Sequence, residues 1–220
     1  MSTWLVTGAS RGIGLELARQ LHARGDHVIA TCRTRTAELD AVGCRVVVGI
    51  DVGSDEVGAA LLEALGDGTV DVVVNNAGLA RWDTLETIDL DAAREELEVN
   101  ALGPLRVTLA LLPRLGRGAK IALVSSRAGS MGDGPSGRNY GYRMSKAALN
   151  MLGANLAADL AAREIHVAVL HPGFVRTSMT QGGGSIDPPE SAAGLIRQID
   201  ELDARRSGRF FHADGSEVAW

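Results

Sequence analysis

The stretch Thr3–Gly14, TWLVTGASRGIG, decides the fold of this 220-residue chain. Its first five residues predict a short buried strand, and the residues after Gly14 predict an amphipathic helix up to about Arg24. The three glycines between these elements let the backbone approach a ligand, and a helix N-terminus offers free N–H groups to an anion. A pyrophosphate site is therefore expected here. The spacing GxxxGxG differs from the common GxGxxG fingerprint, so a purely structural turn is the alternative.

Strand and helix patterns alternate along the rest of the chain. We expect strands at residues 27–32, 45–50, 70–74, 120–124, 166–170 and 209–212, and helices at 54–65, 91–112, 142–162 and 188–202. This alternation predicts an α/β Rossmann-type fold, a doubly wound parallel sheet of about seven strands with helices on both faces in three αβα layers. No repeat, linker or change of composition divides residues 1–220, so we predict one domain. Gly103-Pro104 is expected to kink the helix 91–112 just after Asn100.

Composition narrows the function. The net charge of −5 argues against a nucleic-acid or anionic-membrane partner. The chain has no signal-like start and no apolar run of the roughly 18 residues of a membrane span, so we expect a cytoplasmic protein. Cys32 and Cys44 are predicted at opposite edges of the sheet, which disfavours a disulfide. Neither the cysteines nor the scattered histidines have metal-ligand spacing, so no metal site is predicted.

The end of the second predicted strand indicates which dinucleotide the chain prefers. Sites for NAD usually place an acid there for the ribose hydroxyls, but the sequence reads Cys32-Arg33-Thr34-Arg35, with no acid before Glu38. Guanidinium groups match phosphate oxygens, so we predict that Arg33 and Arg11 hold a 2′-phosphate. NADP(H) is therefore expected over NAD(H). The alternative is that both arginines are merely solvated at the surface.

A tyrosine–lysine pair supplies a candidate acid–base group. The chain has two tyrosines, and only Tyr142 has a lysine, Lys146, four residues on and therefore on the same helix face. A nearby positive charge is expected to lower the pKa of the phenol, which makes it a proton donor or acceptor near neutral pH. A surface pair on a helix is the alternative. Tyr140 pairs by the same spacing with Met144, so we expect it to line the loop 127–141 or only to pack.

Several motifs follow strands and should therefore meet at one edge of the sheet. They are the glycine loop, Arg33, Asp51, residues 75–78, Ser126 and Pro172-Gly173. In such sheets ligands bind beyond the carboxyl ends of the strands, so this edge is the predicted site.

The motifs, taken in order over essentially the full chain, resemble those of the short-chain dehydrogenase/reductase family. They are Thr7-Gly8-xxx-Gly12-x-Gly14, Asp51-Val52, Asn75-Asn76-Ala77-Gly78, Asn100, Ser126, Tyr142-xxx-Lys146 and Pro172-Gly173-xxx-Thr177. Residues around Ser126 and Tyr142, the sequence Leu-His-Pro-Gly and the tail ending in tryptophan look like the branch that holds sniffer-type carbonyl reductases and the bacterial developmental C-factor.

The resemblance implies a mechanism. NADPH would deliver hydride to a carbonyl carbon while Tyr142 protonates the oxygen, and Ser126 would hydrogen-bond that oxygen. Lys146 would lower the pKa of the tyrosine and hold the ribose, and Asn100 would hold a water that passes protons to Lys146. The substrate would be a small carbonyl compound or alcohol.

The resemblance also implies the cofactor contacts. Asp51 and Val52 would meet the adenine, Asn76, Ala77 and Gly78 would line the ribose, and Val175 and Thr177 would touch the carboxamide. The remaining members of the cofactor-binding set are Gly8, Ser10, Arg11, Gly12, Ile13, Gly14, Arg33, Tyr142, Lys146, Pro172 and Gly173.

Two departures from the family pattern affect the substrate side. Ser126 and Tyr142 are farther apart than in many members, so the loop 127–141 has extra residues, and Ser125 could substitute for Ser126. The segment Ser178–Pro188, where many members have a long lid, is short and has few apolar side chains. We therefore expect an open site of broad specificity.

Alternative functions and an assembly remain open at this point. An NADP-binding signalling or regulatory protein of the C-factor type is the leading alternative, followed by a sugar-nucleotide epimerase and a methyltransferase. The helices 91–112 and 142–162 are apolar on more than one face, so a homodimer or homotetramer through them is expected.

Overall fold

The computed structural model describes residues 1–134 and 136–220; Pro135, inside the predicted loop 127–141, lies outside them. The described chain forms a seven-stranded sheet in the order β3-β2-β1-β4-β5-β6-β7, in which every neighbouring pair is parallel. The strands are β1 Thr3–Thr7, β2 His27–Cys32, β3 Arg45–Val48, β4 Val70–Asn75, β5 Leu115–Val124, β6 His166–His171 and β7 Arg209–His212. This confirms the predicted fold class. The strand order reverses between β1 and β4, which makes the edge there the expected place for a ligand.

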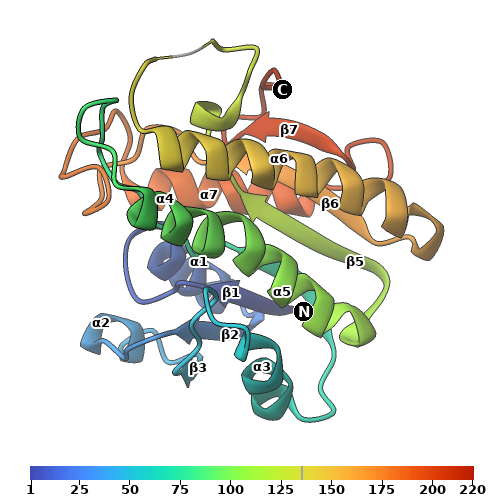
Figure 1. Ribbon diagram of the computed structural model, residues 1–220. Helices are drawn as coiled ribbons and strands as arrows, with labels where there is room; N and C mark the ends of the chain where they lie inside the picture. The colour runs from blue at the N-terminus through green and yellow to red at the C-terminus, as the bar shows by residue number, and fades with distance from the viewer. Residues whose placement is uncertain (135) are drawn as a thin grey trace.

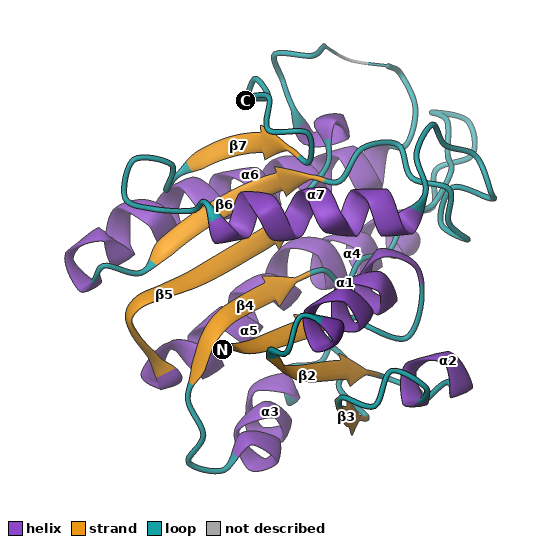
Figure 2. Cartoon of the chain, turned by 180° about the vertical axis from the view of Figure 1, so that it is seen from behind, coloured by secondary structure: helices purple, strands orange, loops and turns teal. Residues whose placement is uncertain are grey.

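Helices cover both faces of this sheet (Figures 1 and 2). The α-helices are α1 Gly12–Ala23, α2 Ala37–Asp40, α3 Val57–Leu65, α4 Leu90–Leu97, α5 Gly103–Leu111, α6 Tyr140–Leu160 and α7 Pro188–Asp200. Short helical turns are η1 Glu98–Leu102, η2 Leu112–Arg114, η3 Arg127–Gly129 and η4 Ala161–Arg163. Helices α1 and α7 pack on one face, and α3, α5 and α6 on the other.

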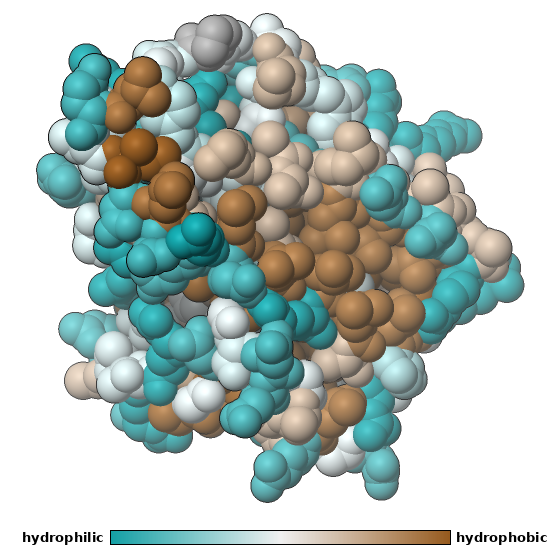
Figure 3. Space-filling model, viewed as in Figure 1, coloured by the Kyte–Doolittle hydropathy of each residue, from teal (hydrophilic) through white to brown (hydrophobic). Residues whose placement is uncertain are grey.

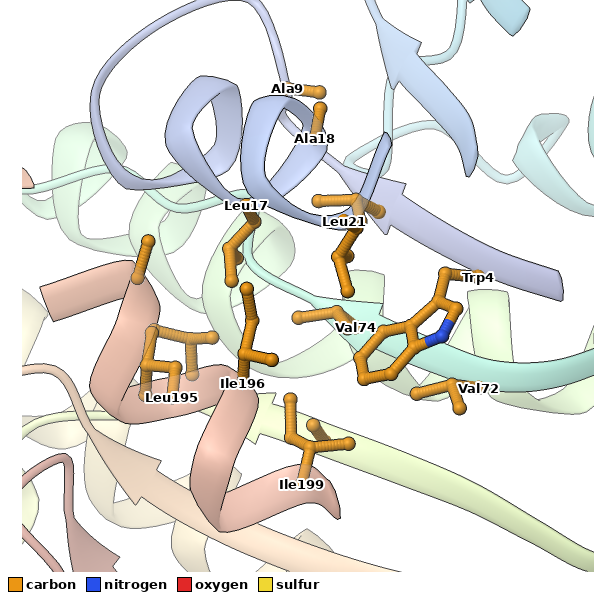
Figure 4. Close-up of a cluster of buried hydrophobic side chains, with 14 of the residues drawn as sticks. Trp4, Ala9, Leu17, Ala18, Leu21, Val72, Val74, Leu195, Ile196 and Ile199 are labelled. Carbon is orange, nitrogen blue, oxygen red and sulfur yellow. The ribbon is translucent and has the colours of Figure 1, made fainter. Parts of the chain in front are cut away.

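Alternating side chains of the strands build one apolar layer on each face. Trp4 and Val6 of β1 point toward α1 and α7, whereas Leu5 between them points toward α3, α5 and α6. Figure 4 shows the first layer, in which Leu21 of α1 and Ile199 of α7 meet the indole of Trp4. Burial on both faces explains why the strands read as nearly continuous apolar runs in the sequence.

The predicted helix 91–112 is interrupted, and the interruption lies earlier than expected. Residues Glu98–Leu102 form a π-helical turn that contains Asn100, and α5 begins only at Gly103. Pro104 has no N–H group to continue an α-helical ladder, and a π-turn is a usual local solution. Gly103 also lies close to the backbone of the segment after β3: an ideal Cβ on Gly103 would lie 2.9 Å from the carbonyl oxygen of Val52.

Other element bounds differ by a few residues. The strand β3 ends at Val48 and β5 begins at Leu115, while α6 begins at Tyr140, two residues before the predicted start. Cys32 and Cys44 are both free thiols. None of the described helices is both long enough and apolar enough to cross a bilayer. The cytoplasmic location stays a prediction from the sequence.

Candidate active site

A cavity of about 640 Å³ lies at the carboxyl ends of the central strands, where the sequence predicts the site. The predicted cofactor residues in its wall are Gly8, Ser10, Arg11, Gly12, Ile13, Gly14, Arg33, Asp51, Val52, Asn76, Ala77, Gly78, Tyr142, Lys146, Pro172 and Thr177. The wall also contains residues that the sequence reasoning missed, among them Thr34, Thr36, Leu79, Arg81 and Met179. A second hollow of about 540 Å³ at the opposite edge of the sheet contains none of the motif residues.

The glycine loop has a tight conformation in which Gly8 and Gly14 leave no room for a side chain. Gly8 has φ +67°, and an ideal Cβ on it would lie 2.8 Å from the Cα of Ala77. A Cβ on Gly14 would lie 2.4 Å from the carbonyl oxygen of Gly8. Helix α1 starts at Gly12 without a side-chain cap, so its first N–H groups are available to an anion. This arrangement fits a pyrophosphate group.

Thr7 and Asn76 fix the loop to the sheet. The Thr7 Oγ1 accepts hydrogen bonds from the backbone N–H groups of Asn76 and Ala77, both at 3.0 Å, and donates to the carbonyl of Val74 at 3.4 Å. The Asn76 side chain donates to the carbonyls of Thr7 and Gly8 at 2.9 and 3.2 Å. Asn76 therefore braces the glycine loop, and Thr7, the first residue of the family motif, ties that loop to the turn after β4.

Two arginines on the cavity wall are free to bind a phosphate. The side chains of Arg11 and Arg33 are exposed, and neither has an ion pair among the residues that the structure describes. Arg35, by contrast, pairs with Asp40 at 3.1 Å and does not line the cavity. Cys32 occupies the end of β2, where sites for NAD usually have an acid, and it is buried at 2% exposure.

Ser126, and not Ser125, lies against the Tyr142 phenol. Ser126 is the serine whose side chain acts on the Tyr142 phenol and lowers its pKa, whereas the Ser125 hydroxyl is buried in the cavity wall and donates to Asn150 Oδ1 at 2.5 Å. Burial raises the pKa of the Tyr142 phenol, the Ser126 hydrogen bond lowers this pKa, and the charge of Glu96 raises it. The net direction is upward, so Tyr142 is a protonated phenol in this environment.

Lys146 is buried close to the Tyr142 ring. Its Nζ lies 5.8 Å from the centroid of the Tyr142 ring and donates to the carbonyl oxygen of Val124 at 2.9 Å. Burial lowers the pKa of Lys146 to about 8. In the cofactor-free site the net pKa of Tyr142 is raised, chiefly by burial, so the expected lowering by Lys146 stays a prediction.

Asn100 is fully buried and does not face solvent. Its Oδ1 accepts from the backbone N–H of Leu79 at 2.7 Å, and its Nδ2 donates to the Leu79 carbonyl at 2.7 Å and to Ser145 Oγ at 2.9 Å. The side chain fastens the segment after β4 to α6. An ideal Cβ on Gly78 would lie 3.3 Å from Asn100 Oδ1 and 3.8 Å from Lys146 Nζ, so Gly78 leaves open the space near both groups. The water relay stays a prediction.

Two of the predicted cofactor residues do not reach the cavity. Gly173 packs against Ile186, since a Cβ on it would lie 2.6 Å from Ile186 Cδ1. Val175 is 3% exposed and forms a β-bridge with Ile186. The turn that follows β6 folds back on itself and turns both residues inward, whereas Thr177 lies close to the glycine loop, 3.5 Å from an ideal Cβ on Gly12.

Two loops meet at the mouth of the cavity. The indole Nε1 of Trp82, in the segment after β4, donates to the carbonyl of Met179 in the segment after β6 at 3.3 Å. The side chains of Trp82 and Met179 are 56% and 38% exposed. An apolar rim therefore stands beside the polar catalytic groups. No group of three or more His, Cys, Asp or Glu within residues 1–134 and 136–220 is arranged to hold a metal ion.

Comparison with known proteins agrees with this geometry. The sequence model of the family described as short chain dehydrogenase matches residues 2–185. The chain belongs to the short-chain dehydrogenase family. It is therefore an oxidoreductase that acts on CH–OH or C=O groups with a nicotinamide dinucleotide.

Two similar members of the short-chain dehydrogenase family have names that describe different functions. The chain is 46% identical over 226 residues to the 1-hydroxy-2-glutathionyl-2-methyl-3-butene dehydrogenase of Rhodococcus sp. (strain AD45), with both chains covered in full. It is 44% identical over 156 residues to the C-signal protein of Myxococcus xanthus, which covers 70% of this chain and 94% of that protein.

Solved short-chain dehydrogenase structures superpose closely on the fold. One from Burkholderia multivorans with bound NADP has a TM-score of 0.92 at 30% identity, over 100% of this chain and 99% of the other. The carbonyl reductase Sniffer of D. melanogaster has a TM-score of 0.89 at 29% identity, with both chains covered in full. An NADPH-bound carbonyl reductase from chicken fatty liver has a TM-score of 0.88 at 30% identity, over 100% and 99%.

Proposed function

We propose that this short-chain dehydrogenase is an NADPH-dependent reductase of aldehydes and ketones, with Tyr142 as general acid. The observation that carries this proposal is the contact of Ser126 with a protonated Tyr142 beside a cavity whose glycine loop fits a dinucleotide. A reductase needs its acid in the protonated form, and burial keeps the phenol in that form.

The roles of the residues follow from their positions. The dinucleotide supplies the hydride when it is bound. Ser126 holds the carbonyl oxygen beside the Tyr142 phenol, which gives its proton to the oxygen as negative charge develops there. Lys146 keeps a positive charge near the reacting groups, although its hydrogen bond to Val124 fixes its position. Asn100 acts through Leu79 and Ser145, which it holds in place.

Preference for NADP(H) over NAD(H) rests on the two free arginines. Arg11 and Arg33 stand on the cavity wall, and the end of β2 has no acid that would repel a 2′-phosphate. Solved relatives named above contain NADP or NADPH, which supports the same cofactor here.

Replacing Tyr142 with phenylalanine tests the mechanism. The change removes one oxygen and little volume, so NADPH binding measured by fluorescence titration should persist. General acid catalysis contributes about 10²–10⁴-fold, so turnover should fall at least about a hundredfold. Tyr140→Phe is the matched control and should stay within about tenfold of the parent, since a bystander contributes no proton transfer. A folded Tyr142→Phe enzyme with parental turnover would reject the mechanism.

The second candidate is an NADP-binding signalling protein, favoured by the similarity to the C-signal protein. A pure sensor needs no proton donor, so the contact between Ser126 and Tyr142 argues for the enzyme. NADPH binding without turnover across aldehydes, ketones, diketones and quinones would favour the sensor.

The exposed apolar side chains beside the cavity support broad specificity. Trp82 and Met179 offer an apolar rim to part of a substrate. The similarity to a dehydrogenase named for a glutathionyl alcohol adds such alcohols to the panel, assayed in the oxidation direction with NADP⁺. Turnover restricted to one class would contradict this part of the proposal.

We also propose that the protein forms a homodimer or homotetramer whose interface contains α5 and α6. Figure 3 shows apolar side chains gathered over these two helices. Leu102 and Leu109, and likewise Met144 and Met151, are seven residues apart and between 41% and 62% exposed. Such a contiguous apolar face on a helix pair usually packs against a partner, and an identical face would form a symmetric interface.

A further inference from the structure

The start of helix α6, which carries the proposed acid, is capped by a residue from elsewhere in the chain. The N-cap residue of α6, Asn139, has φ +56° and ψ +51°, in the left-handed region, and its side chain caps no N–H group of the residues that the structure describes. A usual N-cap has an extended backbone, from which its side chain reaches the N–H groups of the first turn. The first turn of α6 therefore depends on an acceptor outside the helix.

Asp83, in the segment between β4 and α4, supplies that acceptor. Its Oδ1 accepts a hydrogen bond from the backbone N–H of Tyr140 at 2.8 Å, across 57 residues of sequence. Its own carbonyl oxygen accepts from the N–H of Asn139 at 3.0 Å. Asp83 thus satisfies two donors that a helix start leaves without a partner inside the helix, and its carboxylate faces the positive end of the helix dipole.

The segment that carries Asp83 is itself held in place. Leu79 exchanges two hydrogen bonds with the side chain of Asn100, both at 2.7 Å. The backbone N–H of Arg81 donates to Glu96 Oε1 at 2.7 Å. Residues 79, 81 and 83 are thus bonded in turn to η1, α4 and α6, and Figure 1 shows the segment beside the N-terminal end of α6. Asp83 is therefore a fixed support for that helix end.

Tyr142 lies between two anchors of the helix backbone. Before it, Asp83 holds the N–H of Tyr140. After it, Ser145 Oγ donates to the carbonyl oxygen of Tyr142 at 2.8 Å and accepts from Asn100 Nδ2 at 2.9 Å. Because only one residue separates Tyr140 from Tyr142, a shift of the first turn of α6 would move the phenol with it.

We propose that Asp83 is a positioning residue that fixes the first turn of α6 and so places the Tyr142 phenol for proton transfer. The inference rests on the proposed role of Tyr142 as general acid. Proton transfer needs donor and acceptor within hydrogen-bond reach, and a misplacement of about 1 Å can lower a rate about a hundredfold. Lys146 lies one turn further along α6 and is held by the Val124 carbonyl. Loss of the Asp83 cap should therefore lower turnover more than NADPH affinity.

Three replacements of Asp83 separate the cap from the charge. Asp83→Asn keeps the oxygen acceptor without the charge, Asp83→Glu keeps the charge but moves the oxygen by one methylene group, and Asp83→Ala removes both. The matched control is Asp89→Ala, which removes the cap of α4, a carboxylate that accepts from the backbone N–H of Asp91 at 2.9 Å. Circular-dichroism melting gives the folded fraction of each variant, by which kcat is corrected.

Asp83→Ala and Asp83→Glu should lower kcat for carbonyl reduction about tenfold and leave the Kd of NADPH within about twofold of the parent. Asp83→Asn should keep kcat within about threefold, because its oxygen still accepts from Tyr140. Asp89→Ala should keep the parental kcat although it loses a comparable cap. A loss of kcat in Asp83→Asn as large as in Asp83→Glu would assign the effect to charge and overturn the inference.

Hydrogen–deuterium exchange tests the structural step without turnover. The amides of Tyr140 and Arg143 are bonded to Asp83 and to the Asn139 carbonyl, and both should exchange about tenfold faster in Asp83→Ala. Neither should change in Asp83→Asn or Asp89→Ala. Unchanged exchange, or parental kcat in folded Asp83→Ala and Asp83→Glu proteins, would contradict the inference. A parent without NADPH-linked turnover would reject the proposed function instead, and exchange would still decide whether Asp83 holds the turn.

Discussion

Replacing Arg33 with alanine should weaken the binding of NADPH and leave the binding of NADH nearly unchanged. The guanidinium of Arg33 is exposed on the cavity wall and has no ion pair among the residues described, so its removal should cost little stability, within about 0.5 kcal/mol. A charged hydrogen bond to a phosphate contributes about 1.5–3 kcal/mol, which is about ten- to a hundredfold in Kd. Fluorescence titration should therefore show that weakening for NADPH and a nearly unchanged Kd for NADH.

Arg35→Ala is the matched control, because Arg35 is two residues away but pairs with Asp40 and does not line the cavity. It should leave both dissociation constants near those of the parent. The double variant of Arg11 and Arg33 should weaken NADPH further and bring the two cofactors to similar affinity. Equal weakening of NADPH and NADH by Arg33→Ala alone would show that Arg33 is structural and that the phosphate assignment is wrong.

Three further predictions follow from the packing. Gly8→Ala should abolish NADPH binding, because its Cβ would lie 2.8 Å from the Cα of Ala77, and titration against the folded variant checks this. The unfolding free energy of the cofactor-free protein should rise by up to about 3 kcal/mol between pH 8 and about 10.5, where the folded state has lost the Lys146 proton and the unfolded chain keeps it. Lys146→Met should lack that rise in urea unfolding. Leu109→Glu and Met151→Glu, both on the exposed apolar face, should give a species near 23 kDa in sedimentation, and a parent that already sediments at that mass would reject the oligomer.

The sheet and the edge that holds the site were predictable from local patterns. The strand after Thr3, the glycine loop and the pair Tyr142 and Lys146 all rest on residue type and spacing, which act over a few positions. The resemblance to a known family added the roles of Asn100 and Ser126.

Features that depend on tertiary packing were not predictable. A glutamate in an acidic helix usually faces water, and only the contact of Glu96 with Gly141 reveals that it is buried. The hydrogen bonds of Asn100 to Leu79 join residues 21 positions apart, so local spacing did not reveal them. Spacing placed Lys146 on the face of Tyr142 but did not reveal that the Val124 carbonyl takes its ammonium group.

We expect the two sides of the site to differ in local stability, and the hydroxyl group of Thr7 stabilises one of them. It joins the end of β1 to the turn after β4 at the centre of the sheet, so the amide protons of Asn76 and Ala77 should exchange with deuterium only on global unfolding. The Trp82 and Met179 loops, linked by one exposed hydrogen bond, should exchange through local opening. We therefore expect substitutions in these loops to change which substrate is accepted without lowering the melting temperature, which makes the rim the place to engineer specificity.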